Sequence, residues 1–293
     1  MDRMIRCISA DGSVMACAVD VSDMAFTAQK VHEATPVAAA ALGRLLAAGS
    51  MMGGMLKQKE ASLTLRVDGG GPIGQVVVVA NSAGNCRGYV TNPSVRVPNR
   101  ADGKLNVGGA VGQNGLLYVM RDYGTGEPYV GQIPLVSGEI AEDITSYYAV
   151  SEQIPTVCAL GVLVDKESAG VLLAGGLLIQ LLPAADDDVA RRVEENTALL
   201  EPVTTMLAKG MTLEDMCALA LRGFEMQKLD EFPVAYTCTC SKERTLRMLS
   251  TLSKEDILSL RDEKGYAEAK CNFCAKAYHI SNEELEKLAQ EKI

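Results

Sequence analysis

The 293-residue sequence has no tryptophan and two histidines, and aromatic residues make up 4% of it. Aliphatic side chains, alanine and glycine must therefore build the core, and the 48% hydrophobic content is enough for a large one. With only His32 and His279 available, no Ser/His/Asp or Cys/His catalytic arrangement can be argued. ATP-binding motifs are also missing, so the sequence gives no support to an ATP-driven activity.

Positive charge is scarce relative to negative charge. The chain has 28 Lys and Arg against 37 Asp and Glu, which gives a net charge of −9 and a pI near 4.9. An acidic surface repels phosphate backbones, so we expect no nucleic-acid partner.

Neither a membrane-spanning segment nor a secretory signal is predicted from the sequence. The most apolar stretch, residues 36–56, carries Arg44 near its middle, and a charge there costs about 2.5–3.5 kcal/mol in lipid. We expect a buried helix there and no membrane partner. Residues 1–10 mix charged and apolar side chains, unlike a secretory signal. Nine scattered cysteines, an odd number, favour a reducing compartment, so we expect a cytoplasmic protein.

The patterning predicts an α+β protein in three parts. These are a mixed helix-and-strand core domain (1–183), an acidic helical linker (184–232) and a small C-terminal domain (233–293). In the core domain we expect a helix from Ser137 to about Gln153, and strands over the aliphatic runs 157–164 and 171–182, buried on both faces. Residues 69–74 (GGGPIG) match a dinucleotide-binding fingerprint, but a strand follows, so we interpret them as a hairpin turn.

The linker carries most of the excess charge. Residues 184–231 contain five Lys or Arg and eleven Asp or Glu, a net charge of −6. Thr212 and Asp215 form a weak capping box that opens one of its helices. The simpler interpretation is a solvated, acidic helical connector. The more specific interpretation is a marginally stable linker whose helices can unfold. Several methionines in it suit an adaptable surface, although helix packing explains them equally well.

Four of the nine cysteines form two close pairs near the C-terminus. Cys238 and Cys240 are separated by one residue, and after thirty residues Cys271 and Cys274 follow as a Cys-x-x-Cys pair. Two close thiolate pairs on either side of a supersecondary unit are the arrangement that a structural zinc site needs. We predict that these four thiolates bind one Zn²⁺ per chain.

Other interpretations of the cysteines are weaker. Four unrelated buried cysteines would not fall into two pairs within 37 residues. His279 could replace one ligand, but four sulfurs already complete the shell, so an ordinary strand residue is expected. The remaining cysteines are best interpreted as small buried hydrophobic residues: Cys7, Cys17, Cys86, Cys158 and Cys217.

A zinc site of this kind is also sensitive to oxidation. Thiolates are nucleophilic, and once they are oxidised to disulfides they no longer hold zinc. Metal binding contributes about 10–16 kcal/mol in small zinc folds, and a domain of some sixty residues is marginal without such help. Loss of zinc should therefore unfold the C-terminal domain.

The residues resemble a known family, the redox-regulated heat-shock protein 33 chaperones. The resemblance rests on the spacing of the four cysteines and on five further segments: GGGPIG (69–74), YVTNP (89–93), SGEIAED (137–143), SEQIP (151–155) and AGGLLIQ (174–180). It covers essentially the whole chain. It implies an ATP-independent holdase that is not an enzyme, inactive while reduced and zinc-bound, with the C-terminal part acting as a zinc-binding redox-switch domain.

The resemblance also implies how the switch works. Oxidants would form the disulfides Cys238–Cys240 and Cys271–Cys274, release zinc and unfold the switch domain with its linker. The exposed apolar surface would bind unfolding client proteins, and the active oxidised form would be a homodimer.

Two other function classes fit the sequence less well. A nucleic-acid-binding zinc ribbon would need a basic face, but residues 232–293 contain ten basic and ten acidic residues. A thiol–disulfide oxidoreductase would need a reactive cysteine at a helix N-terminus in a βαβ unit, and both pairs are predicted in turns and strands.

Overall fold

A computed structural model describes residues 1–291, which divide into two compact units. The first is Met1–Thr237, and the second begins at Cys238. The predicted α+β class is confirmed, since both helices and sheets are present throughout. The chain passes from the first unit to the second once, between Thr237 and Cys238. Each unit has its own hydrophobic core.

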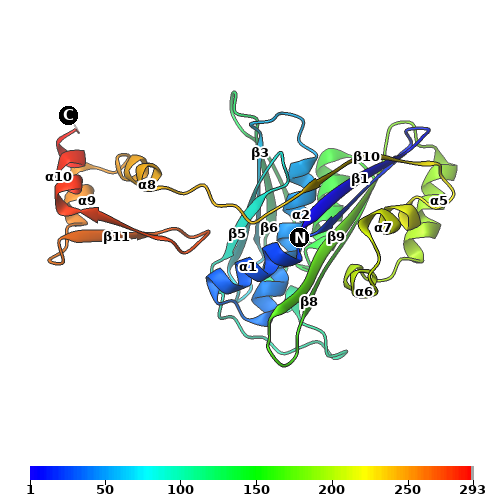
Figure 1. The fold of residues 1–293 in the computed structure, drawn as a ribbon, viewed down its shortest axis with the longest axis horizontal. Coiled ribbons are helices and arrows are strands. Elements are labelled where there is room, and N and C mark those ends of the chain that lie inside the picture. The colour runs from blue at the N-terminus through cyan, green and yellow to red at the C-terminus, as the bar shows by residue number, and fades with distance from the viewer. Residues whose placement is uncertain (292–293) are drawn as a thin grey trace. The chain divides into compact units, whose positions relative to one another are not determined.

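Two five-stranded antiparallel sheets form the first unit (Figure 1). Sheet A has the strand order β10-β1-β2-β9-β8 and comprises β1 (Arg3–Ser9), β2 (Val14–Asp20), β8 (Thr156–Val164), β9 (Val171–Leu181) and β10 (Met226–Pro233). Sheet B has the order β5-β4-β3-β6-β7 and comprises β3 (Ser62–Asp68), β4 (Gln75–Asn81), β5 (Cys86–Val90), β6 (Leu116–Asp122) and β7 (Tyr129–Pro134). Residues 69–74 join the antiparallel strands β3 and β4, which confirms the predicted hairpin turn.

Helix α2 (Pro36–Gly54) packs against strands of both sheets and forms the centre of the main core (Figure 1). It is long and apolar enough to cross a membrane, but 94% of its most apolar window is buried inside the protein, as predicted for a core helix. Small residues allow this close packing: a Cβ on Gly53 would lie 2.7 Å from the Asn81 carbonyl oxygen. Arg44 does not remain unpaired, because its Nη1 lies 2.5 Å from Glu139 Oε2.

Shorter helices complete the main core. They are α1 (Ser22–His32), α3 (Val107–Val111) and α4 (Ala141–Tyr147), which continues into a π-helical turn, η1 (Tyr148–Glu152). The predicted helix start after Ser137 was wrong by a few residues. The Asp143 carboxylate accepts hydrogen bonds from the Val136, Ser137 and Ile140 N–H groups, and this holds the preceding residues in a turn.

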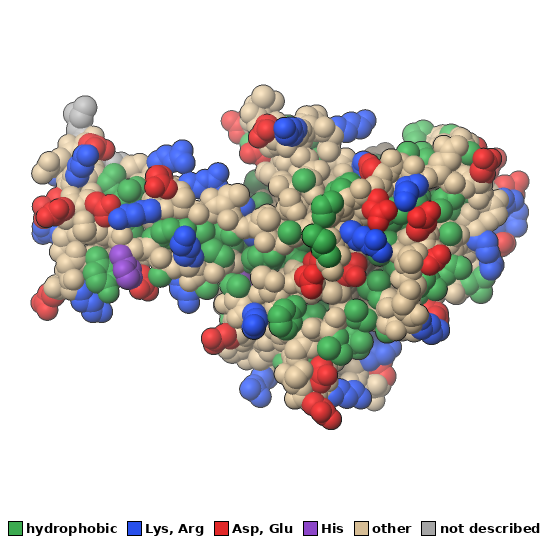
Figure 2. All heavy atoms as spheres, in the orientation of Figure 1, with side chains coloured by type: hydrophobic (Ala, Val, Ile, Leu, Met, Phe, Trp, Pro, Cys, Tyr) green, Lys and Arg blue, Asp and Glu red, His purple; other side chains and the backbone are tan. Residues whose placement is uncertain are grey.

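Three helices cover the face of sheet A that points away from α2 (Figure 1). They are α5 (Asp187–Ala198), α6 (Val203–Ala208) and α7 (Leu213–Ala220). Alternating residues of β1, β2 and β9 point into this second core, which also contains Val193, Met206, Leu213, Met216 and Cys217 from the helices. The outer side of α5 carries acidic and basic side chains, and that of α7 carries Glu214 and Asp215; Figure 2 shows charged side chains over this part of the surface. These helices therefore cover an apolar sheet face with a charged outer surface.

The segment predicted as a helical linker, 184–232, is not helical throughout, because residues 226–233 form strand β10. β10 pairs with β1 from Met226↔Ser9 to Pro233↔Arg3. Ion pairs between Arg6 and Asp230 and between Arg3 and Glu231 (3.2 Å) support the pairing. The strand is mostly exposed and rich in charge, so its own sequence carries no clear strand pattern, and pairing with a distant segment decides its structure.

The prediction that both aliphatic strands are buried on both faces was correct for most of β9 and wrong for β8. Strand β9 lies between β2 and β8, with one face toward α2 and the other toward α6 and α7. Strand β8 is an edge strand, and its Val157 and Leu163 are each 38% exposed. An aliphatic run predicts burial only where both faces of the strand are covered.

The second unit is a small hairpin with three helices. It comprises α8 (Lys242–Leu249), α9 (Lys254–Ser259), β11 (Tyr266–Lys270), β12 (Ala277–Ser281) and α10 (Asn282–Gln290). Ser241, Ser253 and Ser281 cap the N-termini of α8, α9 and α10, each side chain accepting a backbone N–H, and Ser281 with Glu284 forms a capping box. Among its described residues, 238–291, six side chains are buried in a common core: Leu249, Ile257, Tyr278, Ile280, Leu285 and Ala289.

We expect Met216→Ala to weaken the attachment of α7 to sheet A. Met216 is fully buried, and removal of a buried Met side chain costs about 2–5 kcal/mol of unfolding free energy. Urea unfolding followed by circular dichroism measures this loss. The matched control is Leu219→Ala on the same helix, because Leu219 is 38% exposed. Equal losses for the two variants would contradict the packing described for α7.

Candidate metal centre

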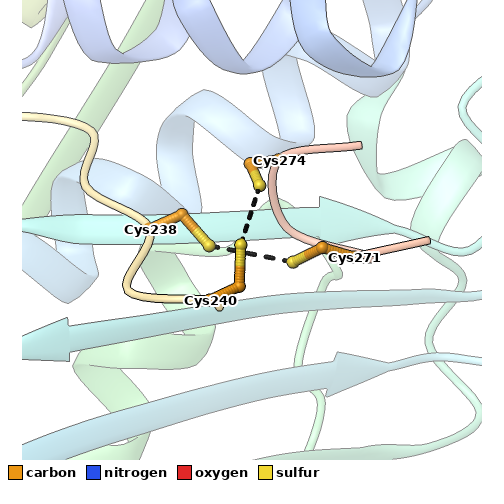
Figure 3. Close-up of side chains that lie close together, drawn as sticks. All are labelled: Cys238, Cys240, Cys271 and Cys274. Carbon is orange, nitrogen blue, oxygen red and sulfur yellow. Dashed lines mark hydrogen bonds between the residues drawn. The ribbon is translucent and has the colours of Figure 1, made fainter. Parts of the chain in front are cut away.

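The four cysteines of the second unit come from two separate segments. Cys238 and Cys240 lie in the extended chain just before α8, and Cys271 and Cys274 lie in the connection between β11 and β12. Figure 3 shows the four side chains converging, and all four Sγ atoms lie within 4.8 Å of one another. The structure therefore brings together every residue that the sequence analysis selected for the site.

The hairpin explains why Cys271 and Cys274 point to the same side. Lys270 pairs with Ala277 at the end of the ladder, so residues 271–276 must reverse the chain. The Cys271 N–H donates to the Lys276 carbonyl at 2.9 Å, and the Ala275 N–H donates to the Cys271 carbonyl at 2.9 Å. Ala275 adopts a left-handed φ of 57°, which closes this tight turn.

The sulfur spacing fits a tetrahedral metal ion. A zinc ion bound at about 2.3 Å from each sulfur would separate neighbouring sulfurs by about 3.8 Å. Cys238 Sγ lies 3.7 Å from Cys271 Sγ, and Cys240 Sγ lies 3.3 Å from Cys274 Sγ. A disulfide would need about 2.05 Å, and all four cysteines are free. The donor set and its spacing therefore match a four-thiolate zinc site.

The close sulfurs perturb one another's ionisation. Burial opposes ionisation of Cys240, but a hydrogen bond from Tyr278 Oη (3.1 Å) and the neighbouring thiols outweigh it and lower its pKa to about 7. Burial and the neighbouring sulfurs, Cys240 foremost, raise the pKa of Cys274 to about 12. Ionisation of one sulfur therefore hinders ionisation of the next, and a bound cation would be needed to hold all four as thiolates near neutral pH.

The other residues that the sequence analysis considered lie elsewhere. The remaining five cysteines are all buried, as predicted. His279 is on β12, with its Nε2 3.2 Å from Glu268 Oε2, in keeping with an ordinary strand residue. His32 Nε2 lies 2.8 Å from the Gly88 carbonyl oxygen, a hydrogen bond that indicates a structural role in the first unit.

Sequence reasoning missed Tyr278. Its ring lies in the core of the second unit, and its hydroxyl reaches Cys240. The available signal was its position four residues after Cys274, on a strand leaving the cysteine turn.

Comparison with known proteins identifies the family of this chain. The model of the Hsp33 protein family matches residues 2–281. The 33 kDa chaperonin of Acetivibrio thermocellus is 45% identical over 289 residues, covering 99% of this chain and 97% of that protein. The 33 kDa chaperonin of Clostridioides difficile strain 630 is 44% identical over 290 residues, covering 99% of both. The crystal structure of the 33 kDa chaperonin from Thermotoga maritima (heat shock protein 33 homolog) aligns with a TM-score of 0.90 at 34% identity, covering 99% of this chain and 98% of that one. The chain therefore belongs to the Hsp33 family.

Proposed function

We propose that this protein is a redox-regulated, ATP-independent chaperone that holds unfolding proteins during oxidative stress. The observation that carries the proposal is the convergence of four cysteine sulfurs within 4.8 Å, in a small unit whose own core has six buried side chains. Membership of the Hsp33 family, and the name chaperonin given to its relatives, support the same function. We propose no enzymatic activity.

In the reduced state, Cys238, Cys240, Cys271 and Cys274 would hold one Zn²⁺ as thiolates. The bound ion would neutralise part of their charge and tie the segment before α8 to the β11–β12 turn. Because fifty-odd residues with so small a core are only marginally stable alone, the fold of the second unit would depend on these bonds.

Oxidation would remove the ligands in pairs, as Cys238–Cys240 and Cys271–Cys274. For each pair the two thiolates lose two electrons and form one S–S bond. One hydrogen peroxide accepts the electrons, its O–O bond breaks, and with two protons from solvent it leaves as two water molecules. A disulfide sulfur is a poor zinc ligand, so the ion would be lost and the second unit would unfold.

We propose that the client-binding surface includes the face of sheet A beneath α5–α7. This face is lined by apolar residues of β1, β2 and β9: Ile5, Val14, Ala16, Ala18, Leu177 and Ile179. The helices that cover it are short, and the segment that contains them carries a net charge of −6. Their detachment would expose both the sheet face and their own Met206 and Met216. Methionine adapts well to varied partners, as a promiscuous client site requires.

The remaining partners follow from the same proposal. The active oxidised form would be a homodimer, its clients would be unfolded or misfolded proteins, and it would work in the cytoplasm. Neither nucleic acid nor a membrane would be a partner.

The proposal predicts that peroxide at raised temperature releases one zinc per chain and switches on suppression of aggregation. A zinc indicator would follow metal loss, and light scattering would follow a heat-denatured client. Suppression only after oxidation would support the redox-switched holdase. Release of zinc with continued client aggregation would refute the chaperone function, and zinc that stays bound would make the site purely structural.

Removal of a single ligand should abolish the metal site. We expect Cys271→Ser to lower the zinc content from one per chain to nearly none. Loss of most of the metal's contribution, about 10–16 kcal/mol, should leave residues 238–291 sensitive to proteolysis. Metal analysis and limited proteolysis measure the two effects. Cys158→Ser is the control, because Cys158 lies on β8 in the first unit. A Cys271→Ser protein that keeps its zinc would exclude this ligand set.

A further inference from the structure

The hydroxyl of Tyr278 makes a contact with the metal centre that the ligand set itself does not explain. Tyr278 Oη donates a hydrogen bond to Cys240 Sγ at 3.1 Å. Cys240 Sγ also lies 3.3 Å from Cys274 Sγ, so the hydroxyl contacts a sulfur that belongs to the cluster. A phenol has one proton to donate, and here that proton is directed at a sulfur and not at solvent or a carbonyl oxygen.

The position of this hydroxyl is fixed by the fold of the second unit. Tyr278 is the second residue of β12, opposite Ala269 of β11, and is only 8% exposed. Its ring packs in the small core with Ile280 and Leu285, and Lys276 Nζ lies 5.2 Å from the ring centre. The tyrosine therefore cannot turn its hydroxyl away from Cys240 without disturbing the core.

A hydrogen bond to a metal-ligating sulfur has two chemical effects. It stabilises the charge of the thiolate, which favours the form that binds a metal ion, and it draws on a sulfur lone pair, which makes the sulfur a weaker nucleophile toward oxidants. Partners of this kind around metal ligands typically change metal affinity by about 10- to 100-fold.

We propose that Tyr278 is a positioning residue of the metal centre, whose hydroxyl strengthens metal retention at Cys240 and raises the resistance of the site to oxidation. The inference rests on the proposed zinc site and adds a residue that controls its sensitivity. Because the same side chain belongs to the core of the second unit, it links the packing of that unit to the sulfur cluster.

The test is Tyr278→Phe in the full-length reduced protein, which removes the hydroxyl and keeps the ring in the core. The matched control is Tyr266→Phe, because Tyr266 lies on the paired strand β11 with its ring 4.3 Å from that of His279. Competition with a chromogenic chelator measures zinc affinity, and a zinc indicator measures the rate of release by peroxide. We expect Tyr278→Phe to weaken zinc binding about 10- to 100-fold and to speed release, and Tyr266→Phe to leave both unchanged.

A second readout separates a hydrogen bond from a merely structural role. With Co²⁺ in place of zinc, loss of the hydrogen bond should raise the energy of the sulfur lone pair and move the thiolate-to-metal absorption band to longer wavelength in Tyr278→Phe. The band should not move in Tyr266→Phe. The inference would be overturned if Tyr278→Phe showed an unshifted band and a zinc affinity within about twofold of the natural protein. Equal changes in Tyr278→Phe and Tyr266→Phe would overturn it as well.

The outcomes also separate this inference from the proposed function. If the natural protein binds no zinc, the metal site and the role of Tyr278 fall together. If the Tyr278 effects are found but oxidised protein does not protect a client, the chaperone proposal fails and the role of Tyr278 stands.

Discussion

The mutual repulsion of four crowded sulfurs is the constraint on which the second unit depends. Their Sγ atoms lie within 4.8 Å of one another, and the raised pKa of Cys274 beside the lowered pKa of Cys240 expresses the cost of ionising them together. A bound cation, as proposed above, would remove that cost and would make the cluster the strongest link between the segment before α8 and the β11–β12 hairpin. Six buried side chains could not replace it.

The first unit has two hydrophobic cores of different extent. Its main core surrounds α2 and is extensive, whereas the second core lies between one face of sheet A and three short helices. Short helices gain little stability from their own hydrogen bonds, so burial against the sheet holds them in place. Local opening would therefore be expected first in the thin covering layer, which fewer buried contacts hold in place.

Much of this could be predicted from the sequence where the signal is local. The serine N-caps of the second unit are local signals of this kind. The spacing of the four cysteines selected residues that the fold brings together, and the apolar segment 36–56 was expected to form a buried helix. These features depend on neighbours along the chain or on the chemistry of one residue type.

The features that could not be predicted depend on distant partners. Residues 226–233 become a strand only because β1, more than two hundred residues earlier, offers an open edge. The exposure of Val157 and Leu163 follows from the place of β8 in the strand order. The role of Tyr278 needs the register of β12 against β11 and the path of residues 238–240.

The pairing of β1 with β10 also bears on how the protein is made. Arg3 pairs with Pro233, so the strand that completes this edge of sheet A leaves the ribosome long after β1 does. During synthesis β1 has an unpaired row of N–H and C=O groups, a template for wrong strand pairing. Contacts between such distant segments form slowly, because a long loop must close first. The nascent chain therefore passes through a stage at which it is itself prone to aggregation.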